Sequence, residues 1–508
     1  MAPTPIDTPD WARDAVFYQV FPDRFARSGR LDPPGPFEPW DAPPTTHGMK
    51  GGDLFGVAER LPELAELGIT ALYLSPIFAS AANHRYHAYD YLAVDPLLGG
   101  DAALRELLDT AHGLGMRVIL DGVFNHSGRG FWPFHHVLEN GARSPYRDWF
   151  LLDPDVLAGE RGLNAYPDRG GASGPAALPG YAAWWGIPAL PKLNVRNPHL
   201  RAYLMGVAEH WLRFGIDGWR LDVPAEIDDP TFWPEFRRRC RAVDPEAYLV
   251  GEIWDEAADW LQGDRFDALM NYPLGTAIIG YASAGRLDQS IIEQHGTYRR
   301  MLGVLDARGF ARRLEHLMSI YDPAVTAVQF NLLGSHDAPR VLTLLKRDKA
   351  ADRVAMLLQL MLPGAPCIYY GDEIGMEGGN DPDCRRAFPA DPRAGDRDLR
   401  AFVAALIAAR HRYRPLRRGT VRVLAAEGRC LALAREADGE RALVVVNAGT
   451  TSESITFELP APAWRRIVPL DLPGWDGPSL DPRAADGRRR FTLALPAQRA
   501  LVLLEDPA

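Results

Sequence analysis

The sequence predicts a (β/α)8 barrel with an inserted lobe after the third strand and a C-terminal antiparallel β-sandwich. Eight short apolar runs alternate with longer amphipathic stretches, which is typical of a parallel barrel. The alternation breaks between residues 127 and 191, and after residue 414 the apolar pattern changes to period two. We therefore predict the barrel in residues 1–126 and 192–413, an inserted domain in 127–191, and a β-sandwich in 414–508.

The barrel strands are predicted from the apolar runs, in chain order 15–20, 69–78, 117–126, 216–223, 248–254, 266–272, 327–337 and 365–373. Helical spacing is clear in 101–115 and 198–215. The insert is rich in Gly, Pro and aromatic residues and too long for a simple loop, so we expect a small lobe over the barrel mouth. Near the C-terminus, "CLALAREADGERALVVVN" (430–447) predicts two strands joined by an Asp-Gly turn, and "RRFTLALPAQRALVLLE" (489–505) predicts another pair.

Composition excludes several classes of protein. The 56 basic and 66 acidic residues give a net charge of -10 without a basic stripe, which argues against nucleic acid as a partner. No uncharged apolar run reaches the roughly 18 residues of a membrane span, and no secretory leader pattern begins the chain, so we expect a cytoplasmic protein. The four cysteines form no CxxC pair and are expected to be reduced.

Charged and polar side chains stand at the ends of four predicted strands: Asp121, Asn125 and His126; Arg220 and Asp222; Glu252; His336 and Asp337. In a barrel these ends meet at one mouth, where reacting groups gather. Arg220 and Asp222 are two residues apart and so share one face of their strand. A buried pair of this kind is unfavourable unless chemistry requires it.

Several chemistries are poorly supported. The chain has no HExxH, and its His residues lie on separate strands, so a catalytic zinc has no support. No G-x-S-x-G elbow is present and no G-x-G-x-x-G follows the first strand, which argues against acyl transfer and dinucleotide binding. Paired carboxylates suit glycosidic bond cleavage, in which one attacks the anomeric carbon and another protonates the leaving oxygen.

Four segments resemble, in order and spacing, the motifs of the α-amylase superfamily of glycoside hydrolases: "DGVFNH" (121–126), "GWRLD" (218–222), "GEIW" (251–254) and "LLGSHD" (332–337). Together with "YHAYDY" (86–91), "LPKLN" (190–194) and "GGNDPDCRR" (378–386), they are most similar to the neopullulanase, cyclomaltodextrinase and maltogenic amylase branch. Unlike most of that branch, the chain begins almost at its first barrel strand. We therefore expect it to lack the branch's amino-terminal domain and to be a monomer or a weak homodimer.

The resemblance implies roles for individual residues. Asp222 becomes the nucleophile, Glu252 the general acid/base and Asp337 the carboxylate that steadies the transition state. A retaining mechanism follows, with the two reacting carboxyl groups about 5 to 5.5 Å apart. Arg220 is expected to hold Asp222 ionised, while the surroundings of Glu252 should raise its pKa.

Further residues are implied for the substrate. Tyr89 should stack under the reacting sugar, with hydrogen bonds around its hydroxyls from His87, His126, His336, Asp381 and Arg385. Trp184, Trp185 and Trp254 are either sugar platforms at outer subsites or, equally, part of the core of the insert.

No cofactor is expected. Relatives bind calcium through the equivalent of Asn125 and an Asp where this chain has Lys192, so we expect no calcium there; a second loop, "DRFARSGRLDPPG", offers few oxygen ligands.

The implied activity is hydrolysis of α-1,4 links in maltooligosaccharides and related α-glucans, in a cytoplasmic enzyme. After the nucleophile, "VPAEI" with Glu226 resembles the branch that acts on short oligosaccharides, cyclodextrins or pullulan, sometimes with α-1,6 cleavage or transglycosylation. A 4-α-glucanotransferase, an α-glucosidase and a non-catalytic carbohydrate-binding relative are the alternatives. The intact Asp222, Glu252 and Asp337 argue against the last of these.

Overall fold

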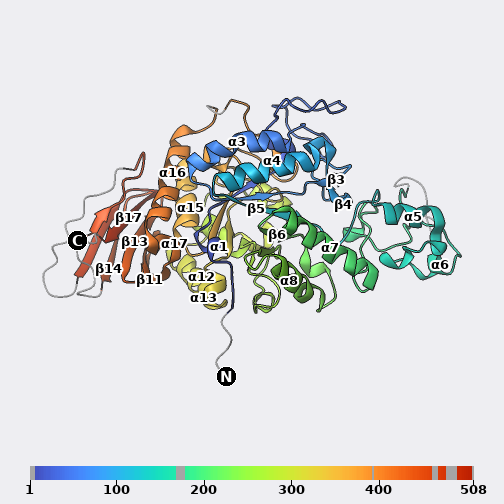
Figure 1. Ribbon diagram of the computed structural model, residues 1–508. Coiled ribbons are helices and arrows are strands. Elements are labelled where there is room, and N and C mark those ends of the chain that lie inside the picture. The colour runs from blue at the N-terminus through green and yellow to red at the C-terminus, as the bar shows by residue number, and fades with distance from the viewer. Residues whose placement is uncertain (1–5, 168–177, 392–393, 460–466, 476–488, 506–508) are drawn as a thin grey trace, which may run out of the picture.

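The computed structural model describes residues 6–167, 178–391, 394–459, 467–475 and 489–505 (Figure 1). Eight parallel strands form one sheet in the order β8-β7-β6-β5-β2-β1-β10-β9. The two outer strands of this order meet through a parallel bridge between Met270 and Phe330, and the amide of Asn271 donates to the carbonyl of Phe330. The sheet therefore closes into a (β/α)8 barrel, which confirms the predicted fold class.

The barrel strands are β1 (Phe17–Val20), β2 (Ala71–Leu74), β5 (Arg117–Gly122), β6 (Gly218–Leu221), β7 (Tyr248–Gly251), β8 (Ala268–Leu269), β9 (Phe330–Leu332) and β10 (Ala365–Tyr369). Each lies within one predicted apolar run and is shorter than it. Many of the residues by which a predicted run exceeds its strand come after the strand, where residues such as Glu252 and His336 already belong to loops. The run 69–78 also begins a second element, because β3 (Phe78–Ser80) pairs antiparallel with β4 (Ala88–Val94).

The longer helices of the barrel are α3 (Leu54–Leu67), α4 (Gly100–Gly113), α7 (Pro198–Phe214), α8 (Phe232–Val243), α9 (Tyr272–Ala282), α12 (Ala307–Ser319), α15 (Lys349–Met361) and α16 (Arg397–Arg412). The shorter ones are α1 (Asp10–Asp14), α2 (Pro22–Phe25), α10 (Gln289–Gln294), α11 (Gly296–Met301), α13 (Pro323–Thr326), α14 (Val341–Leu344) and α17 (Arg414–Arg418). The regular alternation fails once, because β7 and β8 are joined by a loop with only a 3₁₀ turn at Ala258–Trp260.

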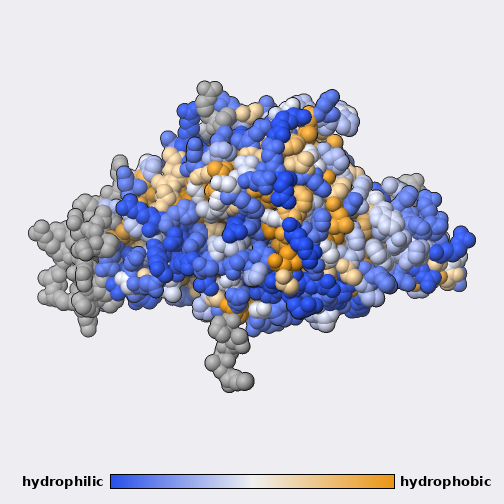
Figure 2. All heavy atoms as spheres, viewed as in Figure 1, coloured by the Kyte–Doolittle hydropathy of each residue, from blue (hydrophilic) through white to orange (hydrophobic). Residues whose placement is uncertain are grey.

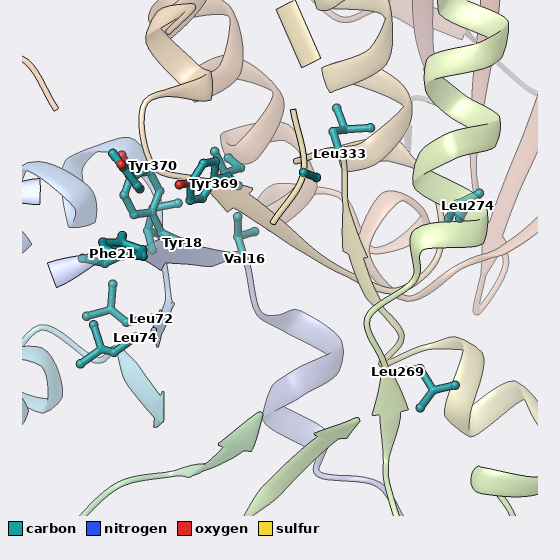
Figure 3. Packing of buried hydrophobic residues seen from close by; sticks show 14 of the residues in the cluster. Val16, Tyr18, Phe21, Leu72, Leu74, Leu269, Leu274, Leu333, Tyr369 and Tyr370 are labelled. Atoms are coloured by element: carbon teal, nitrogen blue, oxygen red, sulfur yellow. The ribbon is translucent and has the colours of Figure 1, made fainter. Parts of the chain in front are cut away.

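Side-chain alternation divides the apolar residues of the strands between two cores. Phe17, Tyr73 and Val250 belong to a cluster inside the barrel. Tyr18 and Leu72, from adjacent strands, belong to the larger cluster that packs the barrel against its helices (Figure 3). On β6, Trp219 and Leu221 belong to that outer cluster. Arg220, which lies between them in the sequence, therefore points into the barrel.

The insert contains α5 (Trp132–Asn140) and α6 (Pro154–Leu157) and carries its own aromatic packing, as Phe134 contacts both Phe150 and Tyr181. Bridges pair Phe150 with Leu193 and Leu152 with Tyr181. Residues 168–177 lie outside the described part of the chain. Figure 1 shows the insert and the C-terminal sheets on opposite sides of the barrel. The exact boundaries given above for the three domains stay predictions.

The C-terminal region has a five-stranded antiparallel sheet, β11-β12-β13-β17-β15, and a two-stranded one, β14-β16. Its strands are β11 (Thr420–Glu427), β12 (Cys430–Ala437), β13 (Glu440–Asn447), β14 (Glu453–Leu459), β15 (Ile467–Pro469), β16 (Arg489–Leu495) and β17 (Arg499–Glu505). Positive φ angles at Asp438 and Gly439 form the expected Asp-Gly turn. Residues 489–505 form two strands, but β16 pairs with β14 and β17 with β13, so they are not a hairpin.

Other expectations can be compared with the structure. Over the described residues no helix has both the length and the apolar character needed to cross a bilayer. All four cysteines are buried and free, as expected. On the face shown in Figure 2, hydrophilic residues cover most of the surface, including most of the insert.

Two buried arginines bind carbonyls at the end of α15, and one of them, Arg435, links the C-terminal sheet to the barrel. Arg435 on β12 donates to the carbonyls of Met361, at the end of α15, and of Gly419. Arg410 on α16 donates to the carbonyl of Leu360 at 2.9 Å. These carbonyls belong to the last turn of α15 or to nearby loops, where helical partners are missing and positive charge is favoured. Burial lowers the pKa of Arg410 to about 10, yet leaves it charged at neutral pH.

Replacing Arg435 with Met should destabilise the protein by about 3 kcal/mol, because several buried carbonyls would lose their donor. Urea unfolding followed by fluorescence measures this change. Arg422→Met, at an exposed position on the neighbouring strand β11, is the matched control and should change stability by less than about 0.5 kcal/mol. Equal effects of the two substitutions would refute a fastening role for Arg435.

Candidate active site

One fully buried arginine organises the carboxylates at the barrel mouth. Nη1 of Arg220 lies 2.9 Å from Oδ1 of Asp121 and 3.1 Å from Oδ1 of Asp222. Its Nη2 lies 2.7 Å from Oε1 of Glu252. Asp222 and Glu252 directly follow the adjacent strands β6 and β7 and are nearly inaccessible to solvent. The structure thus brings the predicted reacting pair onto one guanidinium, while their separation of about 5 to 5.5 Å stays a prediction.

The hydrogen bonds of the two acids differ. Glu252 forms an ion pair with Arg220 through Oε1 and accepts a hydrogen bond from the backbone N–H of Val223, at 3.1 Å from its Oε2. Oδ1 of Asp222 accepts a hydrogen bond from Nη1 of Arg220. The buried Oδ2 of Asp222 has no hydrogen-bond partner among the described residues. One oxygen of Asp222 is therefore left for another group, as a nucleophile requires.

The pKa values of both carboxyl groups of the pair are raised. Burial, with a further contribution from the charge of Glu252, raises the pKa of Asp222 well above its ordinary value, although Arg220 opposes this. Burial also raises the pKa of Glu252; Arg220 opposes the rise and the charge of Asp337 adds to it. One cation faces three carboxylates here, including Asp121. The expectation that Arg220 by itself keeps Asp222 ionised is therefore too simple, because its charge is divided.

Asp337 has partners of its own, which are His336 and Arg385. Its Oδ2 lies 3.0 Å from Nε2 of His336, and its Oδ1 lies 2.9 Å from Nη2 of Arg385. Arg385 also contacts Asp381 at 2.9 Å and donates to the carbonyl of His336. Burial opposes ionisation of Asp337, but His336 and Arg385 outweigh it and lower its pKa. The Asp337 side chain is 35% exposed, compared with 6% for Asp222, so it is much more accessible to solvent.

Tyr86 also belongs to this cluster, and the sequence analysis missed it. Its hydroxyl donates to Oδ2 of Asp121 at 2.7 Å and also hydrogen-bonds Nε2 of His336. The rings of Tyr86 and His336 are parallel, with centroids 5.3 Å apart. Tyr89, the expected stacking residue, instead packs on the loop that contains Gly130, where an added Cβ would come within 2.6 Å of its ring.

The same motif carries two histidines. His87, the predicted one, has its ring 4.9 Å from that of His84, which the sequence analysis did not single out. Burial is the main cause that lowers the pKa of His84, and the neighbouring His87 lowers it further. His84 also interacts electrostatically with Asp337 and Arg385. Burial lowers the pKa of His87 to about 4. Both rings are therefore neutral at neutral pH. Tyr86 precedes the regular part of β4, so strand alternation gave no signal for choosing among the three tyrosines of "YHAYDY".

His126 begins a stack of three rings. Its ring is parallel to that of Trp184, with centroids 5.1 Å apart, and Trp184 in turn stacks on Trp185 at 4.6 Å. Burial lowers the pKa of His126 to about 3, and its Nε2 has no partner among the described residues. Trp185 is 80% exposed and has a positive φ of 50°. The stack thus runs from the site to solvent and ends in an exposed ring.

Trp254 has a more enclosed position than Trp185. Its ring stacks on Tyr272 with centroids 3.6 Å apart, and His295 approaches it at 5.8 Å. His295 also hydrogen-bonds the backbone carbonyl of Asp337. Trp254 is half-buried, so one of its faces is occupied by protein.

The residues at the family's calcium position do not fit a metal ion. Nζ of Lys192 lies 3.0 Å from Oε2 of Glu226 and 3.1 Å from its carbonyl oxygen. Oδ1 of Asn125 is buried without a partner among the described residues. Calcium needs six to eight oxygen ligands. An ammonium group bound to two of the nearby oxygens opposes that arrangement, and no cluster of three or more acidic, His or Cys side chains able to hold a metal occurs in the described chain.

Comparisons with known proteins agree with this geometry. The family model described as "Alpha amylase, catalytic domain" matches residues 19–409. The chain is 42% identical over 457 residues to a cyclomaltodextrinase of Geobacillus thermopakistaniensis, covering 89% of this chain and 72% of that one. It is 40% identical over 458 residues to neopullulanase 2 of Thermoactinomyces vulgaris, with the same coverage of 89% and 72%. The solved debranching enzyme of Nostoc punctiforme superposes with a TM-score of 0.85 at 40% identity, covering 99% and 100% of the two chains.

The matched region includes all four strand-end motifs, which carry Asp121, Arg220, Glu252 and Asp337. The chain belongs to the α-amylase family of glycoside hydrolases, in the branch of the cyclomaltodextrinases and neopullulanases.

Proposed function

We propose that this α-glucan hydrolase cleaves α-1,4-glucosidic bonds of maltooligosaccharides with retention, using Asp222 as nucleophile, Glu252 as general acid/base and Asp337 as transition-state stabiliser. The observation that carries the assignment is the shared contact of Asp222 and Glu252 with Arg220. The free Oδ2 of Asp222 supports its role in attack. The raised pKa of Glu252 supports its role as an acid.

The reaction follows from these positions. Oδ2 of Asp222 attacks the anomeric carbon while Glu252 gives its proton to the departing glycosidic oxygen, so the bond breaks and a glycosyl ester forms. Glu252 then takes a proton from water, whose oxygen attacks the same carbon and releases Asp222. Two displacements at one carbon retain its configuration. During the first step the sugar gains positive charge, which favours ionised Asp222 and leaves the shared proton on Glu252.

The second carboxylate cluster supports the sugar ring. Asp337 stays ionised beside Arg385 and His336, which suits an acceptor for sugar hydroxyls. Tyr86, rather than Tyr89, offers an aromatic ring next to Asp121 and Arg220. We assign to Tyr86 the stacking role in the subsite of the reacting sugar.

Outer subsites are provided by tryptophans. Trp185 presents its ring to solvent and is held from behind by Trp184 and His126. A flat exposed ring packs well on the apolar face of a pyranose. Trp254 has one free face beside the loop that carries Glu252, which makes it the second platform.

The relatives support a wider substrate range. One is named a cyclomaltodextrinase, another a neopullulanase, and a third a debranching enzyme. We therefore include cyclodextrins, pullulan and some α-1,6 links among the substrates. The buried free cysteines, among them Cys367 and Cys384, support action in a reducing compartment such as the cytoplasm.

The enzyme is also proposed to work without calcium at the family site. Lys192 supplies a positive charge to the oxygens of Glu226, and one further oxygen, Oδ1 of Asn125, is too few for an ion.

Chromatography of products from maltotriose, γ-cyclodextrin, pullulan and soluble starch tests the activity. We expect short maltooligosaccharides from all four substrates in the end, and no product longer than the substrate from maltotriose. Asp222→Asn should lower kcat by about 10⁴-fold or more while the protein still binds maltotriose, because the amide cannot attack the anomeric carbon. Longer products from maltotriose would instead identify a glucanotransferase, and glucose as the sole early product from soluble starch would identify an α-glucosidase. An active Asp222→Asn variant would exclude Asp222 as the nucleophile.

The same substitution should make the protein more stable at neutral and alkaline pH. The pKa of Asp222 is higher in the folded than in the unfolded state, so folding is penalised once pH exceeds the ordinary value of 3.8. The penalty grows up to the folded pKa and then levels off. Asp222→Asn should raise the melting temperature by about 2 °C or more at pH 8 and have little effect near pH 3.5. Asp228→Asn, at a fully exposed side chain in the same loop, should show no such pH-dependent gain.

Treatment with a strong chelator provides the test of calcium independence. Activity and melting temperature should stay unchanged, the latter within about 1 °C, since loss of a bound stabilising ion would lower it. Adding millimolar calcium afterwards should also have no effect. A clear drop on chelation that calcium restores would contradict the proposal.

A further inference from the structure

The residue that follows the nucleophile has a strained backbone. Val223 adopts φ 36° and ψ 51°, in the left-handed region. A β-branched side chain is unfavourable there. The next residue is Pro224, which favours extended conformations in its predecessor. Two local preferences therefore oppose the observed turn.

The strained turn contacts the general acid/base directly. The N–H of Val223 donates to Oε2 of Glu252 at 3.1 Å, and the chain then continues into a 3₁₀ turn, Pro224–Glu226. The amide of Glu226 donates back to the carbonyl of Val223 at 3.0 Å. Relaxation of Val223 towards an extended conformation would move this turn and with it the amide that holds Glu252.

Strain of this kind persists only where surrounding contacts fix the backbone. The indole N–H of Trp233 donates to the carbonyl of Pro224 at 3.0 Å. Nζ of Lys192 donates to both the carbonyl and the carboxylate of Glu226. The backbone of Lys192 is itself fixed, because it bridges His126 at the end of the β5 motif.

We propose that Lys192 is a positioning residue for Glu252, acting through Glu226 and the left-handed turn at Val223. Through its ammonium group, Lys192 links the last segment of the insert to the loop that follows the nucleophile. Its contact is half exposed, so it contributes little to global stability. Its effect is on the conformation of the turn and therefore on the hydrogen bond to Glu252. This inference rests on the acid/base role proposed above for Glu252.

The test is the pH profile of Lys192→Met on maltotriose. The Val223 hydrogen bond stabilises ionised Glu252, so its loss should raise the pKa of Glu252 and move the alkaline limb of kcat/KM upwards by about half a pH unit. kcat should fall about tenfold, because the acid is less well aligned. Lys192→Arg, which keeps a cation able to reach Glu226, should recover most of kcat and the parental limb.

The chain offers a closely matched control. Arg196 makes an equivalent contact, donating to both the carbonyl and the carboxylate of Asp228 from the same pair of segments. Its partner, Asp228, lies beyond the 3₁₀ turn Pro224–Glu226, so Arg196→Met should leave the alkaline limb and kcat unchanged. A second test uses Val223→Gly in the Lys192→Met background. Glycine adopts the left-handed conformation without steric penalty, so this double variant should move the limb back towards the parental position.

Three results would overturn the inference. The first is that Lys192→Met leaves the alkaline limb of kcat/KM and the value of kcat unchanged, and the second is that Arg196→Met has an equal effect. The third is that the alkaline limb of the double variant stays shifted. Circular dichroism and melting of each variant separate these results from loss of folding. A parental protein that cleaves no α-glucan would overturn the proposed function itself. If the parental protein is active but the Lys192 variants do not behave as expected, only the positioning role of Lys192 is overturned.

Discussion

The site depends on one guanidinium buried among three carboxylates. Arg220 has no access to solvent and contacts Asp121, Asp222 and Glu252 at once. Burial raises the pKa values of both Asp222 and Glu252, and the charge of Arg220, divided among its neighbours, opposes the rise in both. A raised pKa in this pair is what a retaining glycosidase needs, because one acid attacks while the other donates a proton. The excess of carboxyl groups over positive charge around Arg220 is thus part of the reaction mechanism.

The barrel provides this imbalance through strand geometry. On β6, Trp219 and Leu221 face the helices, so Arg220 necessarily faces inward. Asp121 occupies the inner position on the neighbouring strand β5, opposite Arg220 in register. The hydroxyls of Tyr73 and Tyr86 fill the remaining acceptor sites of Asp121. Asp121 is thereby fully engaged, whereas Oδ2 of Asp222 has no hydrogen-bond partner among the described residues.

Much of this arrangement could be predicted from sequence, for reasons that also explain the failures. The spacing of Arg220 and Asp222 fixes their common face once the strand is recognised, and motif order brings Glu252 and Asp337 to the same mouth. Tyr86 was missed because it precedes β4, where period-two alternation gives no information. The strands in 489–505 were found, but their partners were not, because β16 and β17 pair with strands distant in sequence. Backbone strain at Val223 has no signature in composition or periodicity.

The separation of the two acidic clusters decides which acid can act in which role. Asp337 has its own partners, His336 and Arg385, and these lower its pKa, so it does not compete for the shared proton. Its negative charge still reaches Glu252 and raises the pKa of that acid. A carboxylate that stays ionised beside the pair therefore does two things at once: it attracts the positive charge that develops on the sugar, and it favours the protonated form of Glu252. Removing the partners of Asp337 would weaken both effects together, which links the recognition of sugar hydroxyls to the proton that starts the reaction.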